Sequence, residues 1–512
     1  MALVTIALSS VGLKFHPRLP ADGRSHPSTA NCTLKWIEQP LDHFSYSATD
    51  KTFHQRYYVN AERWLPGHGP IFFYVGNEAD VGTYVNATGL MWENAAHFRA
   101  MLVFAEHRFY GKSQPTAYHN GGHAARTIDG GHPYLTHELA LADYAVLIAS
   151  LRAEHNASKS PVIVFGGSYG GKLAAWMRLK YGAAVAGAIS ASAPLLAFHG
   201  QQPPWDSGSY YRVITNTATH YSPHCSANVR SAFPLIAARA ASASGRAQLA
   251  AAFSLCDTPP DADAASMLRY FVRDAFDELA MGNYPWPSNY IAGTAAKPMP
   301  AWPMKLACDP LAEPSLAASP DALLRAISRA VSVLYNVSGD EKCFRLPHYP
   351  TPDFPAKPMD GIWDWQWCTE GMPDSFWFST DGVRDMFWHQ PYNQTLVDEH
   401  CRLAWGVTPR TSWIANEYGG RHMGRYHSNI VWSSGGYDGW SSAGVATNAS
   451  SSLVAILIPD GGHHLDLMFS HPDDPPSVRG ARALELAHIE RWIAEFGEQQ
   501  QQVALSAWGD AL

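Results

Sequence analysis

A glycine-rich hexapeptide restricts the folds open to this chain more than any other segment does. Residues 166–171 read GGSYGG, which fits the pattern G-x-S-x-G. The apolar run PVIVFGG at residues 161–167 leads into it, and Leu173 and Trp176 follow at helical spacing. Strand, glycine turn and helix in this order predict a nucleophile elbow, a strained turn that lifts the hydroxyl of Ser168 clear of a sheet. A simple glycine turn with a capping serine is the alternative, and the flanking elements favour the elbow.

Further apolar runs predict a largely parallel sheet around this turn. Short runs rich in β-branched and aromatic residues alternate with helical stretches between residues 52 and 192. One such stretch, residues 136–152, has Leu141, Ala145 and Ile148 on one helical face. Similar runs return late in the chain, followed by an amphipathic helix. The expected strands are residues 70–76, 101–107, 161–167, 186–192, 428–434 and 453–459, and the late helix contains Leu486, Ile489, Trp492, Ile493 and Phe496.

The stretch between the two groups of strands has a different composition. It is rich in Pro, Trp and Ala, and it holds six of the seven cysteines. We therefore predict an α/β fold in which a mainly helical cap domain, residues 195–411, is inserted into a domain formed by residues 34–194 and 412–497.

The two ends of the chain are expected to lie outside these domains. Residues 1–33 are predicted to be a weak signal peptide and N-terminal segment, because the first residues are apolar but lack a basic start. Residues 498–512 include a run of four glutamines and are predicted to form a flexible, frayed tail.

Composition excludes several classes of function. A chain of 512 residues with 46% hydrophobic and 16% charged residues has ample apolar surface for a core, which excludes global disorder. Its net charge is −8 and it has no long run of Lys or Arg, so nucleic acid is not expected as a partner. No apolar run reaches the roughly 18 residues of a membrane span. The 24 histidines would reduce the negative charge in an acidic compartment.

Cysteines and glycosylation sequons indicate the secretory pathway. The six clustered cysteines predict up to three disulfides, and they are favoured over zinc because no C-x-x-C pair occurs. We expect a lysosomal, vacuolar or extracellular location. The clustered cysteines are Cys225, Cys256, Cys308, Cys343, Cys368 and Cys401, and the sequons begin at Asn31, Asn86, Asn156, Asn336, Asn393 and Asn448.

A serine nucleophile needs a general base, and that base needs a group to hold its tautomer. In α/β-hydrolases the chain order is Ser, then Asp or Glu, then His, with the last two on loops after late strands. Asp438 follows the expected strand at residues 428–434, and His463 follows that at residues 453–459. Both residues therefore match the chain order and the loop positions of the α/β-hydrolase triad.

Several neighbours compete for these roles. Asp438 could be an ordinary turn residue, with Asp460 or Asp466 in its place. His464 is adjacent to His463, and sequence geometry does not separate the two. A metal site at the histidine pair is disfavoured, because no further ligands at metal spacing accompany it.

An oxyanion hole requires two N–H donors near the serine. The backbone N–H of Tyr169, directly after Ser168, is the expected first donor. The loop after the first expected strand offers the second, at Asn77 or Glu78, although a simple βα turn is an equal alternative there.

Many ordered motifs give the chain a family resemblance. It resembles the serine peptidases that include lysosomal Pro-X carboxypeptidase and dipeptidyl peptidase II, over about residues 34 to 496. The motifs are LDHF at 41–44, FFYVGNEAD at 72–80, VFAEHRFYGKS at 103–113, GGSYGG at 166–171, AMGNYPWPSNY at 280–290, WDWQWCTE at 363–370, WGVTPR at 405–410, GGYDGW at 435–440 and GGHHLDL at 461–467.

The resemblance implies an α/β-hydrolase domain with a helical cap. It implies a triad of Ser168, Asp438 and His463, and so selects the first histidine of the pair. It also implies the disulfides Cys225–Cys308, Cys256–Cys343 and Cys368–Cys401. Cys32 would then be unpaired, or lost with a processed N-terminus.

Members of the family cleave peptides beside a penultimate proline. Met372 and Trp440 fall where the family lines its proline pocket, and a flat apolar wall suits a pyrrolidine ring. Lys172 departs from the usual Met at its position, which puts the proline preference in question, and Gly439 replaces a usual Pro. Asp364 resembles the acidic residue with which dipeptidyl peptidases bind a free amine.

We therefore predict a serine exopeptidase that cleaves after proline or alanine through an acyl-enzyme and releases N-terminal dipeptides. A Pro-X carboxypeptidase is the main alternative; an esterase or lipase and a non-catalytic binding protein of the same fold are remoter ones. The expected partners are peptide substrates, with a homodimer as one candidate assembly. No cofactor or metal is implied.

Overall fold

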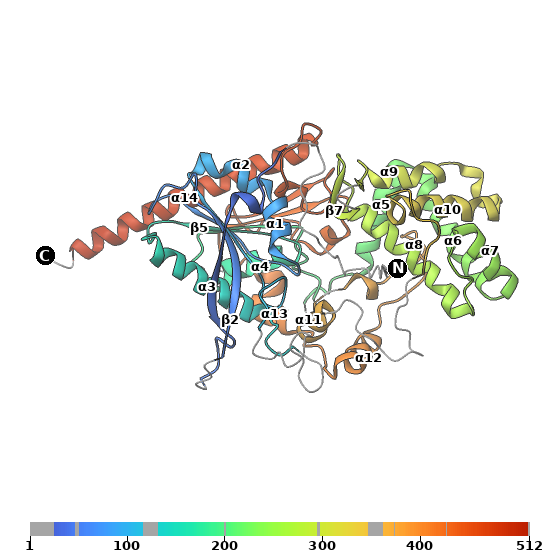
Figure 1. Cartoon of the computed structure of the whole chain (residues 1–512), viewed down its shortest axis with the longest axis horizontal. Helices are drawn as coiled ribbons and strands as arrows, with labels where there is room; N and C mark the ends of the chain where they lie inside the picture. The colour runs from blue at the N-terminus through green and yellow to red at the C-terminus, as the bar shows by residue number, and fades with distance from the viewer. Residues whose placement is uncertain are drawn as a thin grey trace.

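The centre of the molecule is an eight-stranded sheet in the order β1-β2-β4-β3-β5-β6-β9-β10 (Figure 1). The computed structural model describes residues 25–46, 51–115, 132–198, 201–293, 297–346, 362–372, 374–425 and 427–509. The β1–β2 and β2–β4 pairs are antiparallel, and every other pair in this sheet is parallel. The strands are β1 (Thr33–Pro40), β2 (Thr52–Asn60), β3 (Ile71–Tyr74), β4 (Met101–Ala105), β5 (Val162–Gly167), β6 (Gly187–Ala191), β9 (Ile430–Gly435) and β10 (Leu453–Ile458).

The predicted α/β class is confirmed, and each of the six predicted strands is present. The central strands β3, β4, β5 and β6 are buried along their whole length, as expected of parallel strands covered on both faces. The sequence analysis did not predict β1 and β2. Strand β1 is a largely exposed edge strand, and β2 contains His54, Gln55 and Arg56 in succession, so neither forms a continuous apolar run.

Helices cover both faces of the sheet. On one face, Leu147 of α3 (His137–Glu154) and Trp176 of α4 (Tyr169–Lys180) belong to the same hydrophobic cluster as alternate strand residues such as Phe73. On the other face, α1 (Val81–Ala87), α2 (Gly89–Phe98) and α14 (Pro476–Gly509) pack on the intervening residues, with Trp492 fully buried. The sheet is thus a rigid platform whose strand ends hold the loops of the site.

The inserted region has two parts that pack differently. The first part forms a hydrophobic core of its own beside the sheet (Figure 1), and a short hairpin of β7 (Ser288–Gly293) and β8 (Pro298–Met299) joins it. In the second part, Trp363, Trp405 and Tyr418 belong to the hydrophobic cluster of the sheet itself. The first part comprises α5 (Gly208–Tyr221), α6 (Pro223–Ala240), α7 (Ala243–Phe253), α8 (Ala262–Met281), α9 (Pro303–Cys308) and α10 (Pro320–Tyr335), and the second α11 (Ile362–Glu370), α12 (Gln394–Trp405) and α13 (Trp413–Tyr418).

Three disulfides cross-link the inserted region. They join Cys225 to Cys308, Cys256 to Cys343 and Cys368 to Cys401, the pairs that the resemblance implies. Two lie in the first part and the third joins α11 to α12. Each closes a loop of more than 30 residues, and such cross-links stabilise by restricting the unfolded chain. Cys32 is a free, half-buried thiol.

Two predictions about the surface need correction. The Asn86 side chain is 5% exposed and accepts a hydrogen bond from the Thr29 N–H, so this folded structure leaves no room for a glycan there. The predicted tail contains regular structure: α14 continues beyond residue 497 through the glutamines to Gly509, extending past the sheet in Figure 1. Glutamine is a good helix former, and the packed turn at Ile489 and Trp492 supplies the nucleus.

Most of the predicted signal peptide, residues 1–24, lies outside the described residues. None of the described helices combines the length and apolar character needed to cross a membrane.

Candidate active site

Ser168 lies at a strained turn between β5 and α4. Its backbone has φ 59° and ψ −124°, a conformation that costs energy for any residue with a Cβ atom. The surrounding glycines make the turn possible: a Cβ on Gly166 would lie 2.1 Å from the carbonyl oxygen of Gly170, and one on Gly170 would lie 2.1 Å from Oδ1 of Asn77. The structure therefore has the predicted elbow, with Ser168 partly exposed at its tip.

Asp438 and His463 form a buried pair. Oδ2 of Asp438 is 2.6 Å from Nδ1 of His463, and the other oxygen accepts from the Trp440 N–H. The aspartate caps the 3₁₀ turn Gly439–Ala443 directly after β9. With Nδ1 bonded to the carboxylate, Nε2 is the ring nitrogen left to act as a base.

The inserted region holds His463 by its backbone. The His463 N–H donates to the carbonyl of Met281 at the end of α8, and the Tyr284 hydroxyl donates to the His463 carbonyl at 3.0 Å. A loop after β10 is therefore fixed from both sides, by the sheet and by the first part of the insertion.

Ser168 and His463 line one cavity between the sheet and the insertion, here termed the Ser168 cavity. Asn77, Glu78 and Tyr169 line it as well. Tyr169 is the first residue of α4, so its N–H has no partner within the helix. The side-chain amide of Asn77 donates to the Gly167 carbonyl and ties its loop to the elbow. Burial raises the pKa of Glu78.

The competing residues have other partners. The N–H of His464 donates to Ser192 Oγ, and burial together with neighbouring His463 places the pKa of the His464 ring well below its usual range. Asp466 accepts from the Ser433 hydroxyl, and Asp460 from the Ser477 hydroxyl.

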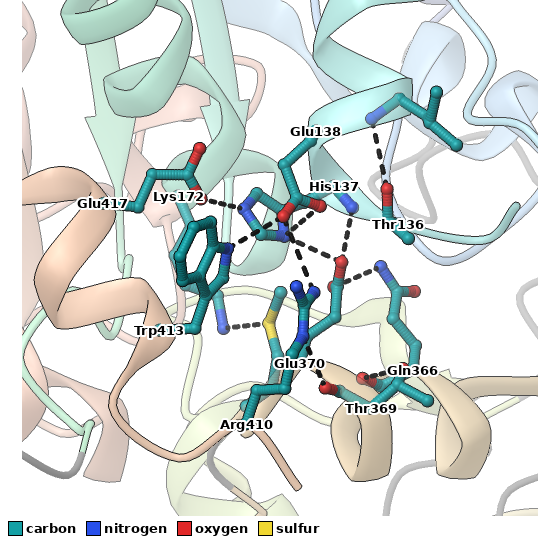
Figure 2. A network of polar contacts seen from close by, with 12 residues as sticks. Thr136, His137, Glu138, Lys172, Gln366, Thr369, Glu370, Arg410, Trp413 and Glu417 are labelled. Atoms are coloured by element: carbon teal, nitrogen blue, oxygen red, sulfur yellow. Dashed lines mark hydrogen bonds and ion pairs between the residues drawn. The ribbon is translucent and has the colours of Figure 1, made fainter. Parts of the chain in front are cut away.

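Of the predicted substrate-binding residues, Lys172 and Trp440 line the Ser168 cavity. Met372 lines a second cavity next to it, together with Phe198 and Trp205. Lys172 nonetheless contacts Met372, because its Nζ is 3.2 Å from the sulfur (Figure 2, where the dashed line from Lys172 marks this contact). The wall between the two cavities thus contains a lysine side chain.

The role predicted for Asp364 is not supported. The residue is fully buried in α11 and is not among the residues that line the Ser168 cavity. Its carboxylate lies 2.9 Å from Nε2 of His400 and accepts from the indole N–H of Trp405 at 2.6 Å. It joins α11 to α12 beside the Cys368–Cys401 disulfide and is not available to a substrate amine.

Within the described residues, two clusters have side chains of the kinds that bind metals. One consists of Asp364, Cys368 and His400, but the sulfur of Cys368 belongs to a disulfide. The other consists of His137, Glu138 and Glu417, where both ring nitrogens of the histidine face carboxylates. Contacts within the protein account for both clusters.

The sequence analysis did not identify several residues of the cavity wall. Trp363, Asp374 and Ser375 come from the second part of the insertion, and Tyr84 and Tyr290 from α1 and the hairpin. Their segments are far apart in the chain and no periodic pattern marks them, so the sequence alone gives little signal for them.

A mainly parallel sheet with helices on both faces and a serine elbow after β5 is the α/β-hydrolase fold, so the protein is a serine hydrolase. The sequence specifies the class further. The model of the serine carboxypeptidase S28 family matches residues 39–485, and the chain belongs to this family. It is therefore a serine-type exopeptidase.

Individual relatives match nearly the whole chain. Lysosomal Pro-X carboxypeptidases of Pongo abelii and Homo sapiens are each 40% identical over 93% of this chain and 92% of their own length. A Caenorhabditis elegans protein named prolyl carboxy peptidase like protein 5 is 32% identical, over 90% of each chain.

Proposed function

We propose that this protein is a carboxypeptidase that removes the C-terminal residue after proline, with Ser168, His463 and Asp438 as its catalytic triad. The observation that carries the proposal is the 40% identity, over 93% of the chain, to proteins named Pro-X carboxypeptidase. The preference for dipeptidyl peptidase activity rested mainly on Asp364, which is buried against His400 and Trp405. That preference therefore loses its main support.

The proposed chemistry is acyl transfer. Nε2 of His463 takes the proton of the Ser168 hydroxyl as the oxygen attacks the carbonyl carbon of the penultimate proline. Asp438, 2.6 Å from Nδ1, holds the ring and stabilises its charged form. The imidazolium then protonates the departing amino group of the C-terminal residue. Water attacks the acyl-enzyme through the same base and releases the shortened peptide.

The oxyanion that forms in each step needs backbone donors. The N–H of Tyr169 at the start of α4 is the proposed first donor, and the helix terminus adds a favourable dipole. The second is proposed from Asn77 or Glu78, whose loop is tied to the elbow through the Gly167 carbonyl. Trp440 offers an apolar wall beside Ser168 for the proline ring.

A location in the secretory pathway, in a lysosome or vacuole, fits the proposal. Three disulfides require an oxidising compartment during folding, and the mammalian relatives are named lysosomal.

Two matched peptides test the reaction. The first is N-acetylated and ends in Pro-Phe with a free carboxylate; the second has a free N-terminus, begins Lys-Pro and is amidated. We expect release of phenylalanine from the first alone, and none from Ser168→Ala. Cleavage of only the second would select the dipeptidyl peptidase, and hydrolysis of acyl esters without peptide cleavage would select an esterase.

A further inference from the structure

Lys172 is a buried cation beside the proposed nucleophile. It lies one helical turn after Ser168 on α4, and its N–H donates to the Ser168 carbonyl at 3.1 Å. The residue is 2% exposed and lines the Ser168 cavity. Ser168 and Lys172 line the same cavity, so a substrate bound at Ser168 occupies the space that the lysine also borders.

The surroundings of the ammonium do not neutralise its charge. Nζ lies 3.2 Å from the Met372 sulfur and 5.6 and 5.5 Å from the ring centres of Tyr169 and Phe198. None of the ion pairs between described residues includes Lys172. Aromatic rings and a thioether attract a cation weakly in comparison with a carboxylate.

Keeping a lysine here costs stability. Burial lowers the pKa of Lys172 to about 7, and the carboxyl groups of Glu78 and Glu370 act in the opposite direction. A methionine of similar length would fill the space without this cost. An unpaired, buried cation that lines a cleft is therefore a candidate for function rather than for packing.

We propose that the ammonium of Lys172 binds a carboxylate of the peptide substrate. Among the described residues that line the Ser168 cavity, Lys172 is the one lysine or arginine, whereas Glu78, Glu278 and Asp374 all have carboxyl groups. A substrate carboxylate entering this cavity thus has one lysine ammonium to meet, beside the two histidines that also line the cavity. The inference rests on the proposed function and deepens it, because it specifies a charged group by which the enzyme recognises its substrate.

Two parts of a peptide could supply the carboxylate. One is the side chain of Asp or Glu at the residue before the scissile bond, in place of proline. The other is the free C-terminal carboxylate that every carboxypeptidase substrate has. The chemistry is the same, since a lysine donates charge-assisted hydrogen bonds to either group.

The test compares matched peptides and variants at mildly acidic pH. The peptides are acetyl-Ala-Pro-Phe, acetyl-Ala-Glu-Phe and acetyl-Ala-Gln-Phe, each as the free acid and as the amide. The variants are Lys172→Met and Lys172→Arg. The control is Lys180→Met on the same helix, which removes a lysine that pairs with Glu417 instead.

We expect wild type to prefer Glu over Gln, or acid over amide, by about 30-fold or more in kcat/KM. Lys172→Met should reduce that ratio to near unity, Lys172→Arg should keep part of it, and Lys180→Met should leave it unchanged. Loss of the Glu preference assigns the contact to the side chain, and loss of the acid preference assigns it to the terminus. Ratios that are equal in wild type and Lys172→Met overturn the proposal, because a packing role would not respond to peptide charge.

A binding measurement separates this inference from the proposed reaction. The same peptides are titrated calorimetrically into Ser168→Ala and into Ser168→Ala/Lys172→Met. If wild type cleaves none of the peptides, the proposed carboxypeptidase activity is wrong, yet the ratio of affinities still decides the role of Lys172. Equal affinities of charged and neutral peptides in both proteins would refute the inference even where cleavage occurs.

Discussion

Of the buried histidines that face carboxylates, His463 and His137 differ in the number of carboxylates around the ring. His463 has one, Asp438, at 2.6 Å from Nδ1, and lines the Ser168 cavity. His137 at the start of α3 has several (Figure 2): Glu370 lies 2.7 Å and Glu138 3.3 Å from Nδ1, and Glu417 lies 3.2 Å from Nε2. One histidine has a ring nitrogen to use in chemistry, and the other has both ring nitrogens occupied.

The carboxylates around His137 decide its protonation state. Burial alone would lower the pKa of His137, but the surrounding glutamates, Glu370 foremost, raise it to about 10. His137 is thus a fixed imidazolium that cannot accept a proton at neutral pH. A general base must be neutral to act, so one carboxylate suits a catalytic histidine and three suit a structural one.

The His137 cluster joins the sheet domain to the second part of the insertion. Glu370 belongs to α11 and Glu417 to α13, while His137 belongs to α3. Glu370 also accepts from Gln366, whose amide donates to the Tyr169 hydroxyl at 2.6 Å. The structural histidine therefore supports the wall behind the elbow without touching the cavity.

Removing His463 tests the catalytic side of the comparison and should have the largest effect. His463→Ala is expected to lower kcat by about 10⁶-fold, because the proposed base is lost, while the protein stays folded. Ser168→Ala should lose about as much, and the double variant little more, since the residues act as a unit. A His463→Ala protein that keeps a tenth of wild-type kcat on acetyl-Ala-Pro-Phe would contradict the assignment.

Neutralising the single carboxylate should have the next largest effect. Asp438→Asn is expected to lower kcat by about 10⁴-fold, because an amide can favour the wrong tautomer of His463. Asp466→Asn is the matched control, since that aspartate accepts from Ser433 and not from His463. Steady-state kinetics on folded proteins measures both; an equal loss in the two variants would show that Asp438 has no special role.

How far the sequence could predict these two sites depends on the separation of their residues. The elbow and the buried parallel strands are local patterns, so the strands that present Ser168, Asp438 and His463 were predictable. Two of the partners of His137, Glu370 and Glu417, lie 233 and 280 residues away in the chain, and no local pattern joins them to it.

Asp364 is a residue to which the sequence analysis assigned a role that the structure does not support. A carboxylate beside tryptophans can be read as a ligand for an amine, but burial is a tertiary property. His400 and Trp405 reach Asp364 from 36 and 41 residues away and satisfy it. Edge strand β1 and its neighbour β2 were missed for a related reason: contacts that only the fold supplies accommodate their polar residues, such as that of Gln39 with Gln55.

Removing His137 tests the structural side of the comparison. His137→Gln should lower the free energy of unfolding by about 3–5 kcal/mol, because it leaves the buried carboxylate of Glu370 without its cation. The kcat of the remaining folded protein should change by only a few-fold. His155→Gln at the other end of α3, whose contact with Glu154 is long, at 3.8 Å, and partly exposed, should cost less than about 1 kcal/mol. Chemical denaturation of both variants measures the difference.

The same cluster predicts a dependence of stability on pH. The pKa of His137 is about 10 in the folded state and near its usual 6.5 when unfolded, so its contribution is complete below about pH 6.5 and disappears as the pH rises towards 10. Between about pH 6 and 9 wild type should lose roughly 2–3 kcal/mol more than His137→Gln. The comparison with the variant removes the contributions of other groups. Parallel curves for the two proteins would show that His137 is not charged in the fold.

Lys172 extends the comparison to a buried cation that forms no ion pair with any carboxylate in the described part of the chain. Its pKa is lowered to about 7 where that of His137 is raised, so the folded state binds the Lys172 proton less tightly than the unfolded state does. Lys172→Met should therefore stabilise the protein by about 1–2 kcal/mol at pH 6, and the gain should shrink as the pH rises towards 10.

Lys180→Met, which breaks the ion pair with Glu417, should instead be neutral or slightly destabilising at both pH values. Denaturation of the two variants at pH 6 and 9 distinguishes the cases. If Lys172→Met destabilises the protein, as the loss of a paired cation would, the ammonium has a partner in the fold. The charge beside Ser168 then has a structural role. If it stabilises the protein while weakening the binding of carboxylates, the lysine is retained for its substrate at the expense of the fold.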